Sequence, residues 1–103
     1  MEHIKEVTPK EVEEIISNED VNTEIIDVRE DEEVASGMIE GAKHIPLGNI
    51  PDVADELDKE KDYILVCRSG RRSMNAALYL DEIGFKVRNM SGGMLEWGGE
   101  VII

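Results

Sequence analysis

The amino-acid sequence predicts an α/β protein with a central, mainly parallel sheet of five strands and helices on both of its faces. Apolar, partly β-branched runs alternate along the chain with segments of helical spacing. Strands that alternate with helices pair in parallel through right-handed crossovers, which place helices on both faces of a sheet. The chain has 103 residues and no repeat or linker, so we expect one three-layered domain over residues 1–103.

The first half of the chain is expected to supply three strands and two helices. The predicted strands are the apolar runs at residues 4–7, 24–28 and 43–45. The second run is strongly β-prone, and we expect it to be a central strand. Thr8-Pro9-Lys10-Glu11 is typical of a capping box with proline at the first helical position, so a helix is expected from there to about Ser17. A short helix is expected over residues 31–36.

The second half of the chain is expected to alternate in the same way. Pro51 suits the start of a helix that runs to Leu57, because its fixed φ matches the first helical turn. In the next helix, residues 73–83, apolar side chains recur three and four apart, and Gly84 is placed to end it. The remaining predicted elements are strands at 63–66 and 85–90 and a short helical turn with Leu95 and Trp97.

A cation-rich loop connects the strand at 63–66 with the following helix. Its sequence is Cys67-Arg68-Ser69-Gly70-Arg71-Arg72-Ser73, and it contains the only cysteine of the chain. The first turn of a helix leaves backbone N–H groups unpaired and carries the positive end of the helix dipole, which favours an anion. A thiolate is such an anion. Cys67 also lies beside three arginines, so we expect its pKa to be lowered and its thiolate to act as a nucleophile at neutral pH.

The other loop residues are predicted to bind the substrate: Arg68, Ser69, Gly70, Arg71, Arg72 and Ser73. Gly70 allows a tight turn that aims several N–H groups at one point, and the three arginines offer fixed positive charge to an incoming anion. The alternative for Cys67 is an inert core thiol, against which three arginines within five positions argue. The alternative for each arginine is contact with solvent or with one of the many carboxylates.

The charge balance and the single cysteine exclude several classes of function. A formal net charge of −13 argues against binding to nucleic acid or to anionic membranes, since both depend on clustered positive charge. No apolar run approaches the ~20 residues that span a bilayer, and residues 1–4 lack the features of a secretory signal, so a cytoplasmic protein is expected. One cysteine forms no internal disulfide and supplies no metal site by itself, so we expect no metal.

Besides the loop, three stretches of the chain carry a resemblance to a known family. They are Ile26-Asp27-Val28-Arg29, the run at residues 37–46 and the run at residues 92–97. Together with residues 67–73 they resemble the single-domain rhodaneses, the thiosulfate sulfurtransferase family. The resemblance covers most of the chain, and it implies the rhodanese-like three-layer fold.

The length of the loop separates this resemblance from the related cysteine phosphatases. In those enzymes five residues lie between the cysteine and the arginine. Here four residues separate Cys67 from Arg72, and Ser73 stands where a phosphatase has arginine. A shorter ring of N–H groups should fit a persulfide sulfur better than a tetrahedral phosphate, so the loop favours sulfur chemistry.

The resemblance implies that the protein transfers sulfane sulfur by a double displacement without a cofactor. Cys67 would take the outer sulfur of thiosulfate or of another persulfide donor and pass it to cyanide or a thiol, while Arg68 and Arg72 orient the donor. A protein is a further candidate for sulfur donor or acceptor, and we expect a monomer. Two alternatives stay open: a non-enzymatic sulfur-carrier or sensing module and, less in keeping with the loop, a phosphatase or arsenate reductase.

Residues outside the loop are predicted to be structural. Asp27 and Arg29 lie two positions apart at a strand end, where such a pair ties neighbouring loops together. His44 is expected to be a packed or surface residue, since no second histidine nearby supports a metal. Trp97 is expected in the core, with Gly92 and Gly93 allowing close approach of the backbone.

Overall fold

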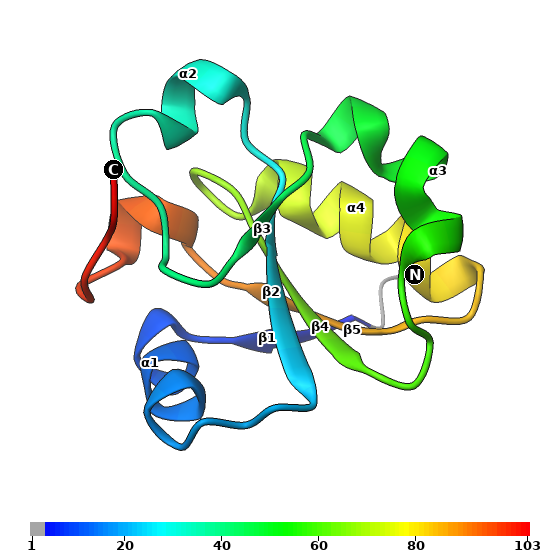
Figure 1. Ribbon diagram of the computed structural model, residues 1–103, viewed down its shortest axis with the longest axis horizontal. Helices are drawn as coiled ribbons and strands as arrows, with labels where there is room; N and C mark the ends of the chain where they lie inside the picture. Colours follow the sequence, from blue (N-terminus) through cyan, green and yellow to red (C-terminus); the bar gives the residue numbers. More distant parts are fainter. Residues whose placement is uncertain (1–3) are drawn as a thin grey trace.

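Five parallel strands form the sheet of the computed structural model, which describes residues 4–103 (Figure 1). They are β1 (Lys5–Val7), β2 (Thr23–Asp27), β3 (Lys43–His44), β4 (Asp62–Val66) and β5 (Lys86–Met90). Their order across the sheet is β1-β5-β4-β2-β3, and every neighbouring pair is parallel. Each predicted strand is confirmed to within one residue at either end. The β-prone second run is an interior strand, between β4 and β3.

Helices cover both faces of this sheet, as predicted. The α-helices are α1 (Pro9–Ser17), α2 (Asp31–Val34), α3 (Ile50–Val53) and α4 (Arg71–Glu82). The described residues also form three short 3₁₀ helices, η1 (Leu47–Asn49), η2 (Ala54–Glu56) and η3 (Gly93–Glu96). Figure 1 shows α1 on one side of the strands and α3 and α4 on the other. Within the described part of the chain, no helix is long and apolar enough to cross a membrane.

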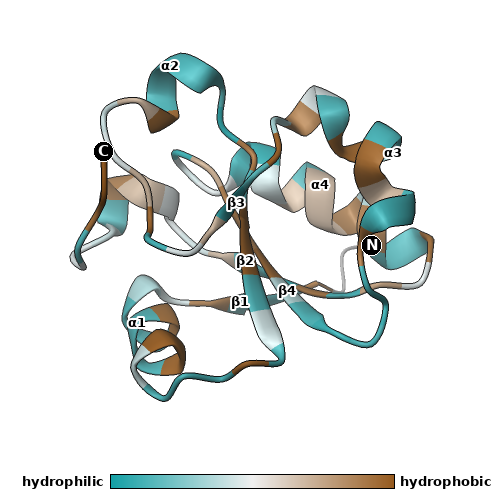
Figure 2. Ribbon diagram, in the orientation of Figure 1, coloured by the Kyte–Doolittle hydropathy of each residue, from teal (hydrophilic) through white to brown (hydrophobic). Residues whose placement is uncertain are grey.

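The alternation of side chains along β2 and β4 divides the core into two clusters. Ile25, Ile64 and Val66 face α1 and pack with Val12 of that helix. Their neighbours in sequence point the other way and pack with α3 and α4, as Ile26 does. Figure 2 shows hydrophobic segments in β2 and β4, whereas α2 is mainly hydrophilic. The next position in the α4-facing series of β4 is the cysteine of the loop, so the pleat of the strand itself directs that side chain towards α4.

Local capping signals account for the start of α1 and the end of α4. The N–H of Glu11 donates to the Thr8 hydroxyl (3.1 Å), and the N–H of Thr8 donates to the Glu11 carboxylate (2.8 Å), which completes the predicted capping box. Gly84 follows the end of α4 with a φ of +102°, a conformation that glycine adopts without a steric penalty. Both predicted signals are confirmed.

Three predicted helices differ from the observed ones in their boundaries. The short helix expected over residues 31–36 ends at Val34. α4 begins at Arg71 rather than at Ser73, because Gly70 has a φ of +98° and turns the chain directly into the helix. The helix predicted from Pro51 to Leu57 begins at Ile50 instead and is divided into α3 and η2. Proline suits this second position as well as the first, because neither N–H has a partner within the helix.

The prediction that Trp97 is a core residue is only partly correct. Its ring is half-buried and packs against the α1-facing cluster from the edge. The indole N–H donates to the carbonyl of Glu100 (3.1 Å), which keeps that polar edge at the surface. Leu95, in η3, is 60% exposed. The short helical turn that follows β5 therefore closes the core at its rim.

Candidate active site

Cys67 lies directly after β4, at the carboxyl end of an interior strand. This is where parallel α/β sheets place their binding sites, since the loops that follow neighbouring strands meet there. The loop between β4 and α4 lies at the same end of the sheet as α2 and η3 (Figure 1). Cys67 is buried, whereas Arg68, Ser69 and Arg71 are exposed. The thiol therefore lies beneath a cationic, solvent-facing loop.

Hydrogen bonds from the loop converge on the sulfur atom. The N–H of Gly70 donates to Cys67 Sγ (3.0 Å), and the buried hydroxyl of Ser73 donates to it as well (3.2 Å). Burial raises the pKa of the Cys67 thiol, but the Ser73 hydroxyl and the N–H groups of Ser73, Gly70 and Ser69 outweigh burial, so the pKa is lowered overall. The predicted direction is confirmed. Its principal causes are these donors rather than the arginines.

The carbonyl groups of the loop are held on its outer side. The Cys67 carbonyl accepts from the N–H of Met94 (2.8 Å), and the Arg68 carbonyl accepts from the N–H of Leu95 (3.0 Å), both in η3. The C=O and the following N–H of a planar trans peptide point in opposite directions. The N–H of Ser69 therefore points away from η3, and it is one of the groups that lower the pKa of the thiol.

Asn89, in β5, holds the loop at a third point. Its side chain is fully buried, and its Nδ2 donates to the Gly70 carbonyl (3.1 Å) and to the Glu6 carboxylate (3.1 Å). Sequence reasoning missed this residue. The signal that was available is a polar side chain near the end of a strand, directly before Met90 and the Ser91-Gly92-Gly93 turn.

Gly93 permits the close approach of η3 to the loop. A Cβ atom at this position would overlap the Arg68 carbonyl and would lie 2.5 Å from the Cys67 carbonyl oxygen. Its φ of +60° also favours glycine. The close backbone approach predicted for the glycine pair is confirmed at this residue.

The three loop arginines differ in their surroundings. Arg72, in α4, makes two hydrogen bonds of 2.8 Å with the two carboxylate oxygens of Glu33, in α2. The bond to Arg72 is the main reason that the pKa of Glu33 falls to about 2. Within residues 4–103, neither Arg68 nor Arg71 pairs with a carboxylate. The alternative of a carboxylate contact, considered for every loop arginine, therefore applies to Arg72. Sequence reasoning missed Glu33, because its acidic run is typical of a solvated surface.

Asp27 and Arg29 form a buried pair that anchors the segment after β2. Arg29 Nη2 donates to the Asp27 carboxylate (2.8 Å) and to the Gly37 carbonyl (2.8 Å), so it ties the turn after α2 to the strand end. His44 Nε2 lies 2.8 Å from the Arg29 carbonyl oxygen. These contacts support the structural role expected for Asp27, Arg29 and His44.

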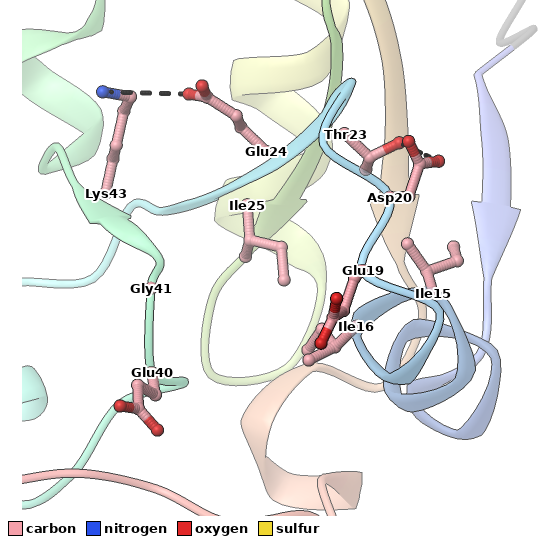
Figure 3. A pocket seen from close by; sticks show the side chains of 10 residues that line it. All are labelled: Ile15, Ile16, Glu19, Asp20, Thr23, Glu24, Ile25, Glu40, Gly41 and Lys43. Atoms are coloured by element: carbon pink, nitrogen blue, oxygen red, sulfur yellow. Dashed lines mark hydrogen bonds and ion pairs between the residues drawn. The ribbon is translucent and has the colours of Figure 1, made fainter.

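A separate pocket lies between α1 and the β2–β3 edge of the sheet (Figure 3). It contains none of the loop residues, and its acidic side chains include Glu19, Asp20 and Glu40. Glu24, also in its wall, is 3.8 Å from Lys43 Nζ and 2.9 Å from Lys61 Nζ. Among the described residues, no group of three or more His, Cys, Asp and Glu side chains is placed to hold a metal ion. The convergent polar groups lie instead around Cys67.

Comparisons with known proteins agree with this geometry. The family model described as "Rhodanese-like domain" matches residues 8–100. The chain is 54% identical over 97 residues to "Putative sulfurtransferase YtwF" of Bacillus subtilis (strain 168), which covers 94% of this chain and 93% of that protein. It is 31% identical over 98 residues to "Thiosulfate sulfurtransferase GlpE" of Ectopseudomonas mendocina (strain ymp), covering 94% and 87% respectively.

A solved structure shows the same fold. The crystal structure of a rhodanese-like domain protein from Staphylococcus aureus superposes with a TM-score of 0.90 at 39% identity, covering 97% of this chain and 98% of that chain. The matched family model spans β2 to β5 together with the cysteine loop and η3. On the family match, the relatives and the shared fold, the chain belongs to the rhodanese-like family.

Proposed function

We propose that the protein is a sulfurtransferase that carries a sulfane sulfur as a persulfide on Cys67. The observation that carries this proposal is the convergence of Gly70 N–H and Ser73 O–H on a thiol of lowered pKa. The same donors suit the terminal sulfur of a persulfide, which carries negative charge at the same place. The names of the relatives, sulfurtransferase and thiosulfate sulfurtransferase, support the same class of reaction.

The reaction has two displacement steps. The Cys67 thiolate attacks the outer sulfur of thiosulfate or of a persulfide donor, a new S–S bond forms, and the S–S bond of the donor breaks. With thiosulfate the electron pair of that bond leaves with sulfite. A thiophile such as cyanide or a thiol then attacks the outer sulfur of the persulfide, and Cys67 departs as a thiolate. Neither step needs an external oxidant or reductant, so the proposed reaction requires no cofactor.

The loop residues other than Arg72, which is paired with Glu33, have proposed roles in these steps. Ser69, Gly70 and Ser73 stabilise the thiolate and the persulfide through their N–H and O–H groups. Arg68 and Arg71 are exposed and attract an anionic donor. Because Cys67 is buried, side chains at the mouth of the loop must move aside to admit the outer sulfur of the donor.

Intact-mass measurement tests this proposal most directly. We expect wild-type protein incubated with thiosulfate, or with a small persulfide, to gain the mass of one sulfur atom on Cys67. Cys67→Ser should gain none and should release no sulfite, because a hydroxyl is far less nucleophilic and forms no persulfide. Sulfite release by Cys67→Ser at the wild-type rate would refute the assignment.

Turnover assays separate the alternatives. A sulfur-carrier module would hold the persulfide and return it to neither cyanide nor a small thiol, whereas the proposed enzyme regenerates its thiolate with either one. A phosphatase would hydrolyse aryl phosphates, and we expect negligible hydrolysis here. The short loop and the pairing of Arg72 with Glu33 both disfavour binding of a phosphate.

A further inference from the structure

The pairing of Glu33 with Arg72 bears on which sulfur donors this site accepts. Both carboxylate oxygens of Glu33 are engaged by the two terminal nitrogens of the guanidinium at 2.8 Å, and both side chains are about two-thirds buried, with exposed fractions of 28% and 34%. Bidentate pairs of this kind are directional and stronger than a neutral hydrogen bond. The two terminal nitrogens of Arg72, which could otherwise bind an oxyanion, are therefore occupied by the Glu33 carboxylate.

The carboxylate of Glu33 stays ionised at every pH at which the enzyme would work, since its pKa is about 2. Arg72 in turn interacts electrostatically with Cys67 and with Glu30, the residue that precedes α2. The positive charge of Arg72, in α4, is therefore already balanced by acidic residues of the neighbouring segment. A second anion that approaches Arg72 meets a neutral pair rather than a free cation.

An oxyanion that bound Arg72 in the bidentate mode would have to displace Glu33. That displacement leaves an ionised, partly buried carboxylate without its partner and next to the new anion, which costs free energy in proportion to the charge of the anion. Thiosulfate carries two negative charges. A persulfide R–S–SH carries no negative charge on its sulfur atoms, or one negative charge when it is deprotonated. Its binding therefore costs much less free energy than that of thiosulfate.

We propose that Glu33 is a specificity-determining residue that directs this site towards persulfides of thiol compounds and away from dianionic donors such as thiosulfate. The inference rests on the proposed function. In the favoured step the Cys67 thiolate attacks the outer sulfur of R–S–SH, the Cys67–S bond forms and the RS–S bond breaks. The electron pair leaves with RS⁻, and the products are the Cys67 persulfide and a thiolate, so the step needs no oxidant or reductant.

The test compares two donors in three proteins. Wild type, Glu33→Gln and Glu32→Gln are assayed with thiosulfate and with cysteine persulfide, and the ratio of the two kcat/KM values is the readout. Glu33→Gln should raise kcat/KM for thiosulfate about tenfold and that for cysteine persulfide less than about twofold, because one fixed charge beside Arg72 is removed. Glu32→Gln removes the same charge from an exposed position of the same helix and should leave the ratio unchanged.

The glutamine variant is expected to keep the local structure. Glu33 Oε1 also accepts from the N–H of Glu30 (2.9 Å), and the amide oxygen of glutamine can accept that bond. If this variant does not fold, Arg72→Gln provides a second test of whether the Glu33 carboxylate disfavours dianionic donors. It leaves Glu33 unpaired, so kcat/KM for thiosulfate should fall at least about tenfold more than that for cysteine persulfide. This extra fall should disappear in the double variant Glu33→Gln/Arg72→Gln, and an extra fall that persists there would mean that Arg72 itself binds thiosulfate and would refute the role of Glu33.

The outcomes distinguish this inference from the proposed function. If wild type forms a Cys67 persulfide with both donors but Glu33→Gln leaves the donor ratio unchanged, the role of Glu33 is refuted and the sulfurtransferase stands. An equal change of the ratio in Glu32→Gln also refutes it, because net charge alone would then explain the effect. If neither donor loads Cys67, the proposed function itself fails.

Discussion

At the scale of single residues, the hydroxyl of Ser73 is the side-chain donor that reaches Cys67 Sγ, and it is fully buried in the first turns of α4. Burial works against the thiolate, so the balance depends on a few short contacts. A serine there does two things at once, since its hydroxyl and its own N–H both lower the pKa of the thiol.

Ser73→Ala should raise the pKa of Cys67, because the hydroxyl that stabilises the thiolate is lost while the N–H remains. The thiolate then forms at higher pH, so the rate of persulfide formation should be several-fold lower at neutral pH and should recover as the pH rises. The measurement is the pH dependence of single-turnover persulfide formation. Ser17→Ala, at the exposed end of α1, is the control. An unshifted profile in Ser73→Ala would contradict the role of the hydroxyl.

Asn89 acts on the sulfur only through Gly70. Asn89→Leu removes the donor to the Gly70 carbonyl and also removes the buried Oδ1, which accepts no hydrogen bond from residues 4–103. We therefore expect a loss of only about 1 kcal/mol in the free energy of unfolding. Persulfide formation should fall more clearly, because Gly70 N–H loses its support. Glu6→Ala removes the other partner of Asn89 without touching the loop and should transfer sulfur at close to the wild-type rate. Equal activity losses in the two variants would argue against positioning through Gly70.

At the scale of elements, η3 holds the loop between β4 and α4 by hydrogen bonds to its carbonyl groups. Two consecutive N–H groups, those of Met94 and Leu95, bind two consecutive loop carbonyls. These bonds require backbone-to-backbone contact, which the glycine at position 93 permits. The four-residue element thereby orients the peptides whose N–H groups face the thiol.

Gly93→Ala should therefore damage the loop and the fold together. Overlap with the Arg68 carbonyl and the positive φ predict a loss of about 2–4 kcal/mol in the free energy of unfolding, together with a large drop in sulfur transfer. Gly48→Ala is the matched control, because no atom lies within 4 Å of a Cβ built there, and it should change stability by less than about 0.5 kcal/mol. Denaturant unfolding measures the change in the free energy of unfolding of both variants. Unchanged stability in Gly93→Ala would contradict the role of η3 in holding the loop.

The four-residue α2 is held in place by polar contacts. Arg29 donates to the carbonyl of Glu33 (3.4 Å), and Arg72 binds the carboxylate of the same residue. None of the residues of α2 is fully buried. The position of α2 therefore depends more on these polar contacts than the position of a helix anchored by apolar side chains would.

At the scale of the whole molecule, the net charge of −13 makes stability dependent on pH. Excess negative charge destabilises a compact fold through repulsion, and this repulsion weakens as the net charge falls in acid. Glu33 contributes in the opposite sense, because its pKa is lowered from 4.5 to about 2 in the folded protein. A carboxyl group with a lowered pKa stabilises the fold above its unfolded pKa, and that contribution is lost as the pH falls towards the folded value.

We therefore expect wild type to be more stable than Glu33→Gln at neutral pH, and this difference to shrink as the pH falls from about 4.5 to about 2. Thermal unfolding of both proteins across this range measures the difference in Tm. Glu32 forms no ion pair within residues 4–103, so Glu32→Gln should show no such trend. A difference that grows on acidification would contradict the assigned pKa shift.

The sequence by itself determined the features whose signals are local. The alternation of apolar runs with helical spacing was enough to predict all five strands and the parallel sheet, because each signal lies within a few residues. The capping box at Thr8, the stop at Gly84 and the position of Cys67 between strand and helix are equally local. The cysteine loop and the stretches around it also sufficed to identify the family.

Only the tertiary structure decided which partners meet around the loop. Arg72 is 39 residues from Glu33, and Asn89 is 19 residues from Gly70, so no local pattern marks either pair. The order of the strands brings the ends of β2, β4 and β5 together, and the residues that follow them become neighbours. An acidic run that is typical of a solvated surface thus supplies the partner of a loop arginine, since side-chain pairing depends on distance in space rather than along the chain.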